Sequence, residues 1–78
     1  MLTMVERRVS ADDRATFLQA VATRRRAADA LRAHVWVFEH STEVGRFVEF
    51  TEAASVDDIA SLCESAAPST IWREVRVD

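Results

Sequence analysis

The chain has 78 residues, which is enough for one domain, residues 1–78, with one small hydrophobic core. Its net charge of −3 disfavours nucleic acid as a partner, and no apolar run approaches the roughly 20 residues of a membrane-spanning helix. The first ten residues lack the apolar core of a signal peptide, so we predict a cytoplasmic protein. Cys63 is the single cysteine, which excludes an internal disulfide. Because no Cys/His cluster predicts a structural metal either, we expect a partner subunit to stabilise so small a domain.

The first half of the chain predicts a strand followed by a long helix. Met4–Val9 is short and β-rich at its ends. Ser10 precedes two acids in the manner of a capping box, so we predict that the helix starts there and fades near residues 30–32. Its apolar positions recur at helical spacing and comprise Phe17, Val21, Ala28 and Leu31. Three consecutive arginines beside this stripe predict a solvated face: Arg24, Arg25 and Arg26.

The second half predicts two strands, a helix and a last strand. Residues 34–39 and 46–51 are rich in β-branched and aromatic residues, and the turn between them ends at Gly45, for which we predict a positive φ. Ser55 repeats the cap signal of a helix that ends at Pro68. The apolar stripe of this helix comprises Ile59, Leu62, Cys63 and Ala66. With residues 71–77 as the last strand, the order is β-α-β-β-α-β.

Alternation along the strands divides their side chains between two faces. We predict that Val37 pairs with Val48, which places like side chains together across the hairpin. The aliphatic face, expected against the helices, comprises Val5, Val9, Val35, Val37, Val48, Phe50, Ile71, Val75 and Val77. Arg7 and Arg73 fall on the same face, and we expect them to lie near strand ends or to snorkel outward. The other face comprises Met4, Glu6, Arg8, His34, Trp36, Phe38, His40, Phe47, Glu49, Thr51, Trp72, Glu74 and Arg76.

This second face mixes aromatic and charged side chains. So aromatic a face is not expected to stay wet on a monomer, and so charged a face is not an ordinary dry core. A face-to-face dimer that encloses a small cavity satisfies both conditions, since apolar walls with a few polar groups are typical of small-molecule sites. The alternative is that the aromatic side chains only pack the dimer.

The chain resembles the dimeric α/β-barrel proteins, which are ferredoxin-like. The resemblance lies in Val5-Glu6-Arg7-Arg8-Val9, in the strand that contains Trp36, and in Gly45-Arg46-Phe47-Val48-Glu49. It is greatest to a subgroup found alone or fused to transporter-like chains; related groups are antibiotic-biosynthesis-type monooxygenases, haem-degrading enzymes and muconolactone-isomerase-like proteins. It implies a four-stranded antiparallel sheet with two helices on one face, and a homodimer whose sheets form a barrel around any site. Haem is not expected, because the haem-degrading relatives use a helix-borne His that both predicted helices lack.

The candidate site residues follow from the aromatic face. We predict Glu49 and His34 as catalytic candidates, and a ligand-binding set of Glu6, Arg8, Trp36, Phe38, Phe47 and Trp72. Glu6 and Arg8 could instead form a structural ion pair, and Cys63 is expected to be a buried, inert thiol. His34 and His40 are about 20 Å apart on an extended strand, so they cannot share a metal ion.

Three functions remain open from the sequence. The first is a small homodimer that binds a small apolar or aromatic ligand between the two sheets. The second is a cofactor-free monooxygenase or isomerase acting in the same cavity. The third is a non-catalytic accessory domain whose aromatic face is filled by its partner. We predict no cofactor and no metal in any of them.

Overall fold

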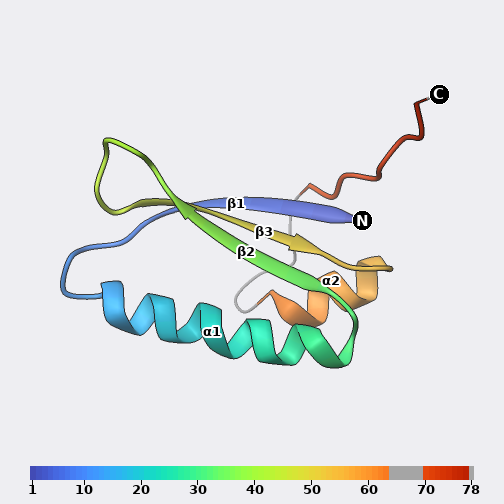
Figure 1. The fold of residues 1–78 in the computed structure, drawn as a ribbon, viewed down its shortest axis with the longest axis horizontal. Coiled ribbons are helices and arrows are strands. Elements are labelled where there is room, and N and C mark those ends of the chain that lie inside the picture. The colour runs from blue at the N-terminus through green and yellow to red at the C-terminus, as the bar shows by residue number, and fades with distance from the viewer. Residues whose placement is uncertain (64–69, 78) are drawn as a thin grey trace.

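The computed structural model describes residues 1–63 and 70–77. Its elements are β1 (Leu2–Arg8), α1 (Arg14–Ala30), β2 (His34–Glu39), β3 (Arg46–Glu52) and α2 (Val56–Leu62). The strands form one antiparallel sheet in the order β1-β3-β2, and both helices pack on the same side of it (Figure 1). The chain is therefore a small α+β fold, compatible with a ferredoxin-like arrangement.

The predicted fourth strand is wrong: among residues 1–63 and 70–77 the sheet has three strands, where a four-stranded, barrel-forming sheet was expected. In the segment predicted as a strand, residues 71–77, Trp72 alone forms an antiparallel bridge, with Leu2. Leu2 lies at the start of β1, so the residues after Trp72 lie beyond that start, and no strand in the described part of the chain lies beside them. Figure 1 shows this segment leaving the body of the molecule.

The helix boundaries follow local hydrogen bonds. The Ser55 hydroxyl accepts a bond from the Asp58 N–H at 3.1 Å, which confirms the predicted cap of α2. Ser10 accepts from the Asp13 N–H at 3.3 Å, but this bond closes a turn, and α1 begins four residues after Ser10. At its other end α1 finishes as predicted, with Arg32 in the left-handed region (φ 53°). The N–H of Ala33 then reaches the carbonyl of Ala28 at 2.9 Å, as in a Schellman motif.

The core lies between the helices and the sheet. Its buried members come from both helices, from β2 and from the connections: Val21, Ala28, Ala33, Val35, Ala53, Ile59 and Leu62. The two predicted helix stripes are thus confirmed in large part, although Leu31 is exposed and Cys63 is half-buried at the edge of the core. Ala66 and Pro68, the predicted end of the second helix, lie outside the described residues.

The predicted register of the hairpin is wrong by one residue. Val37 pairs with Glu49, not Val48, and the hairpin closes with a bond from the His40 N–H to the Arg46 carbonyl at 2.7 Å. Since side chains alternate, one residue of slip moves every side chain of β3 to the opposite face. The buried side chains of β3, which face the helices, are Phe47, Glu49 and Thr51. Val48 and Phe50 therefore lie on the other face.

Gly45 helps to set this register. Its φ is +87°, as predicted, and its carbonyl accepts a bond from the Val9 N–H at 2.8 Å. A Cβ built on Gly45 would lie 2.6 Å from the Val9 carbonyl oxygen, so the close approach requires glycine. The turn thus joins β3 to the end of β1 as well as to β2.

A buried carboxylate is held between the sheet and α1. Glu49 is 6% exposed, and its two carboxylate oxygens are bound by Arg7 of β1 and Arg24 of α1. This geometry overturns the outward placement predicted for Arg7, and also the solvated position predicted for Arg24, whose side chain is 11% exposed. Burying a carboxylate is costly unless it is paired, and here two guanidinium groups provide the pairing.

We expect Glu49→Gln to destabilise the fold strongly, because it leaves two guanidinium groups without the buried carboxylate that neutralises them. The loss should be about 3–5 kcal/mol, a large share of the roughly 5–15 kcal/mol typical of a domain. Urea denaturation followed by circular dichroism measures it. Glu6→Gln, a change to an exposed carboxylate on the other face, is the matched control and should leave the midpoint nearly unchanged. Equal midpoints for both variants would show that the buried cluster does not stabilise the fold.

Candidate functional site

The face of the sheet opposite the helices, here called the open face, carries four exposed large apolar side chains, including both tryptophans. Alternation and the pairing of the strands place on it Leu2, Met4, Glu6, Arg8, His34, Trp36, Phe38, Arg46, Val48, Phe50, Glu52 and Trp72. Phe38 is 55% exposed, Trp72 58%, Met4 50% and Trp36 39%. A contiguous apolar surface of this kind marks an interaction or ligand site more often than a surface that stays in water.

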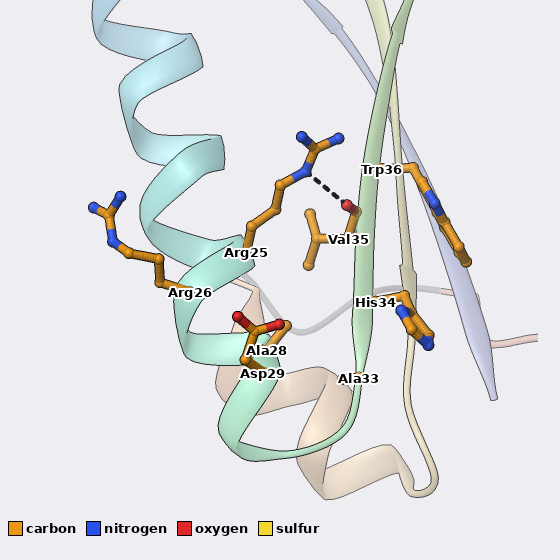
Figure 2. Close-up of a pocket in the computed structure, with 8 residues that line it drawn as sticks. All are labelled: Arg25, Arg26, Ala28, Asp29, Ala33, His34, Val35 and Trp36. Carbon is orange, nitrogen blue, oxygen red and sulfur yellow. Dashed lines mark hydrogen bonds between the residues drawn. The ribbon is translucent and has the colours of Figure 1, made fainter.

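Aromatic side chains on the open face pack against one another along and across the strands. The rings of His34 and Trp36 stack with centroids 5.5 Å apart and planes inclined by 18°. Figure 2 shows both rings on the side of β2 that points away from α1. Phe38 meets Phe50 of β3 edge to face, with centroids 5.8 Å apart. Each of these rings therefore has an aromatic neighbour on the open face, in a stacked or edge-to-face arrangement of the kind that aromatic pairs prefer.

A hollow of about 120 Å³ lies at the hairpin end of the open face. Phe38 and Val48 provide its apolar wall, and Glu6 and Arg46 provide its polar rim. A second hollow of the same volume adjoins it between β1 and Arg46 and includes Arg8. Both volumes suit a single ring, and an apolar wall with a small polar rim is the usual composition of a small-molecule site.

The charges around the hollow are balanced. Arg46 pairs with Glu43 at 2.9 Å and with Glu6 at 3.4 Å, and Arg8 lies 3.9 Å from Glu43. The hydrogen bond from Arg46 lowers the pKa of the Glu43 carboxyl, and the same contact raises the pKa of Arg46. Because each guanidinium has a carboxylate neighbour, the rim does not favour an anion, and it suits a neutral or weakly polar ligand.

The structure brings together six of the eight predicted site residues. On the open face lie Glu6, Arg8, His34, Trp36, Phe38 and Trp72. The predicted pair of Glu6 with Arg8 is replaced by pairs of Glu6 with Arg46 and of Arg8 with Glu43. Phe47 and Glu49 lie on the opposite face, both buried, because the register of β3 differs by one residue from the predicted one.

Sequence reasoning missed the residues that replace them. Val48, Phe50 and Arg46 complete the open face, and all three belong to β3. The length of the turn was the available signal: a loop of residues 41–45 pairs His40 with Arg46, and every later pair follows from that one. Phe47 instead packs on Phe17 of α1 with centroids 4.8 Å apart.

The chemistry open to the predicted catalytic residues follows from their surroundings. Glu49 cannot take a proton from a ligand on the open face, because it lies across the sheet with both oxygens bound by arginines. His34 does reach the open face, stacked on Trp36. His40 accepts bonds at Nδ1 from the N–H groups of Thr42 and Glu43, both at 3.1 Å, and so helps to shape the turn.

Within residues 1–63 and 70–77, no three His, Cys, Asp or Glu side chains are grouped so as to hold a metal ion. No helix in that part of the chain is long and apolar enough to cross a membrane. Comparisons of the chain with protein-family models, curated proteins and solved structures gave no match. The open face is therefore the feature of this chain that points to a function.

The ion pair of Arg14 with Glu39 lies on the helix side of the sheet, near the hairpin, and should make the stability of the fold depend on pH. The hydrogen bond from Arg14 at 2.7 Å, and then the bond from the Gly45 N–H at 2.9 Å, lower the pKa of Glu39 in the folded chain. A carboxyl whose pKa is lower folded than unfolded stabilises the fold above its unfolded pKa, and this stabilisation is lost as the pH falls through the folded pKa. The relevant window therefore lies below the ordinary value of 4.5.

We expect Glu39→Gln to lose less stability than the wild type when the pH is lowered from about 5.5 to about 3. Urea midpoints measured across this range test the expectation. Arg14→Gln, which removes the first cause of the lowered pKa, should flatten the same part of the profile. Parallel profiles for all three proteins would show that this pair contributes nothing to the pH dependence.

Proposed function

We propose that the protein is a homodimeric binding domain, in which the open faces of two copies meet and enclose a small apolar or aromatic ligand. The observation that carries the proposal is the concentration of exposed Trp36, Phe38, Trp72 and Met4 on one face of a 78-residue chain. Burial of this face would supply the apolar contact that so small a domain lacks by itself. An aromatic centre with a charged rim is also the usual anatomy of a protein interface.

The ligand part of the proposal is supported by the hollow between Phe38 and Val48. A second copy over the open face would exclude water from it and leave Glu6 and Arg46 as its polar groups. One carboxylate and one guanidinium can accept from and donate to a hydroxyl or amide on a ring. The ligand class that fits is therefore a small aromatic molecule with one or two neutral polar groups.

An enzymatic function is not favoured by a comparable observation. The oxygenase or isomerase alternative named Glu49 and His34 as catalytic candidates, and Glu6 as a further acid. Glu49 lies on the helix side of the sheet. On the open face, Glu6 pairs with Arg46 and His34 stacks on Trp36. A binding or accessory domain needs only the open face. The ligand-binding domain and the accessory domain differ in what occupies the hollow: a ligand in the first, and side chains of the partner in the second.

We expect Trp36→Ala to weaken self-association, because it removes a large aromatic side chain from the centre of the proposed interface. A loss of about 2 kcal/mol, or about 30-fold in Kd, is typical for an aromatic at such a position. Sedimentation equilibrium over low-micromolar concentrations measures the change. Leu18→Ala, which shortens an exposed apolar side chain on α1, is the control and should leave Kd unchanged. A wild-type chain that stays monomeric would contradict the proposed dimer.

We expect phenol to bind in the hollow, since one ring fits its volume and one hydroxyl suits its rim. Titration followed by amide chemical shifts should move Phe38 and Val48. Val48→Phe, which fills the hollow, should abolish these shifts while the dimer persists; Val56→Phe, on exposed α2, should not. Shifts that are unchanged in Val48→Phe would place the ligand elsewhere, and their absence in the wild type would favour the accessory domain.

A further inference from the structure

The outer edge of β2 has no strand beside it in the described part of the chain, because β2 is the last strand in the order β1-β3-β2. The bond from the His40 N–H to the Arg46 carbonyl sets which residues of β2 bond to β3. By alternation, the N–H and carbonyl groups of Val35, Val37 and Glu39 point to the outer edge. An exposed edge of this kind can receive an extended segment as a further strand.

A groove of about 320 Å³ runs along the start of this edge, between β2 and the end of α1 (Figure 2). Ala28, Ala33 and Val35 line it with small, buried apolar side chains. Figure 2 shows the rings of His34 and Trp36 on the side of β2 that points away from α1. The space beside the edge is therefore left open, and the backbone of an added segment can approach β2.

Arg25 of α1 reaches over this groove to the edge. Its Nε donates a hydrogen bond to the Val35 carbonyl at 3.0 Å (Figure 2). The two terminal nitrogens of the guanidinium point away from that carbonyl. A guanidinium fixed through Nε still presents this pair of nitrogens, which can bind a carboxylate through two parallel hydrogen bonds. Arg25 is therefore placed both to mark the edge and to hold an acidic side chain beside it.

The groove carries positive charge on a protein whose net charge is −3. The charged side chains that line it, among the described residues, are those of Arg25, Arg26 and Asp29. Arg26 donates to the Thr23 hydroxyl at 3.2 Å, and this partner is neutral. Within residues 1–63 and 70–77, neither arginine has a carboxylate at ion-pair distance. The groove thus differs from the rim of the open face, where each guanidinium has a carboxylate neighbour, and it favours an acidic ligand.

The edge and the arginines together specify the class of this ligand. The edge offers N–H and carbonyl groups at the spacing of a strand, which a polypeptide backbone matches and a phosphate chain does not. The arginines add a requirement for carboxylates on the side of the segment that faces α1. An extended acidic polypeptide meets both conditions, because peptide recognition at a sheet edge takes its affinity from the main chain and its specificity from alternate side chains.

We propose that the outer edge of β2 binds an extended, acidic segment of another protein, which adds to the sheet as a strand. The backbone of the segment pairs with the N–H groups of Val35 and Val37, and a carboxylate on its helix side binds Arg25. Because Arg25 already occupies the Val35 carbonyl, the added strand starts there and runs toward Glu39. This surface is separate from the open face, so the inference goes beyond the proposed dimer and does not require it.

The probe for the test is a fluorescein-labelled peptide of about six residues, the usual length of a strand, in which glutamate alternates with valine. We expect it to bind in a fluorescence polarisation titration, whereas the same labelled peptide with lysine in place of glutamate should not. Arg25→Gln should raise the Kd about tenfold or more, because hydrogen bonds to charged groups are lost. Arg32→Gln, which removes the same charge from an exposed residue outside the groove, is the matched control and should leave Kd unchanged.

Amide hydrogen exchange locates the bound peptide. With the glutamate peptide at about ten times its Kd, exchange at Val35 and Val37 should slow about tenfold, because their N–H groups point to the outer edge. The N–H groups of Trp36 and Phe38 point to β3 and should be unaffected. Unchanged exchange at these two amides in Arg25→Gln would also show that this variant keeps the fold.

Several results would overturn the inference. Equal affinity for the glutamate and lysine peptides would show that charge does not select the ligand, and no binding up to about 1 mM would exclude the site. Binding that leaves exchange at Val35 and Val37 unchanged would place the peptide elsewhere. If both amides exchange slowly in the free protein and faster on dilution, a second copy covers the edge instead. A monomeric chain that binds the glutamate peptide would retain this inference and contradict the proposed dimer, so the two fail separately.

Discussion

The pairing of Glu49 with Arg7 and Arg24 is the interaction on which the two faces of the sheet depend. It requires the carboxylate to lie between β3 and α1, because that is where the two guanidinium groups meet. Once Glu49 points to the helices, alternation sends its neighbours Val48 and Phe50 the other way. A charged cluster within the core thus makes the open face more apolar than a conventional arrangement would. As a result, β3 places a carboxylate in the core and two apolar side chains, Val48 and Phe50, on the open face.

This placement of the β3 side chains is informative about function. A domain that used Val48 and Phe50 for its core would need fewer polar groups inside and would expose Phe47 and Glu49. Instead the chain buries a carboxylate, which is costly without two partners, and leaves aromatic rings in water. Such an arrangement is reasonable when another molecule covers the exposed rings. The balanced charges of the rim, where Arg46 lies between Glu6 and Glu43, are consistent with a neutral ligand beneath that cover.

The outer edge of β2 is a second feature that the described residues leave without a neighbouring strand. An exposed strand edge is a liability, and proteins blunt it with charged side chains or cover it. Here Arg25 bonds the edge of β2 at Val35, and residues 73–77 carry a strand-like sequence that lies beyond the start of β1. Among residues 1–63 and 70–77, no other element covers the open face or the segment after Trp72, and the dimer proposed above would cover the open face.

Much of the local structure could be predicted from the sequence. Ser55 caps α2, Gly45 takes a positive φ, and the apolar stripes of the helices are largely in the core, because these features depend on residues close together in the chain. The aromatic content of β2 placed Trp36 and Phe38 correctly on the open face. Six of the eight predicted site residues lie there: five because β1 and β2 alternate as expected, and Trp72 because it bridges Leu2.

The sequence alone could not determine the register of β3, and hence which of its faces is buried, or the position of residues 71–77. Phe47 and Phe50 are equally apolar, so composition cannot choose between two registers that differ by one residue; the choice depends on how residues 41–45 close the loop and on which arginines reach Glu49. The last segment has the composition of a strand, but pairing also requires a neighbour in register, and its bridge to Leu2 leaves it beyond the start of β1. Sequence determined which segments could be strands, whereas the tertiary structure decided which of their faces is buried and which strand has a neighbour, because both depend on residues far apart in the chain.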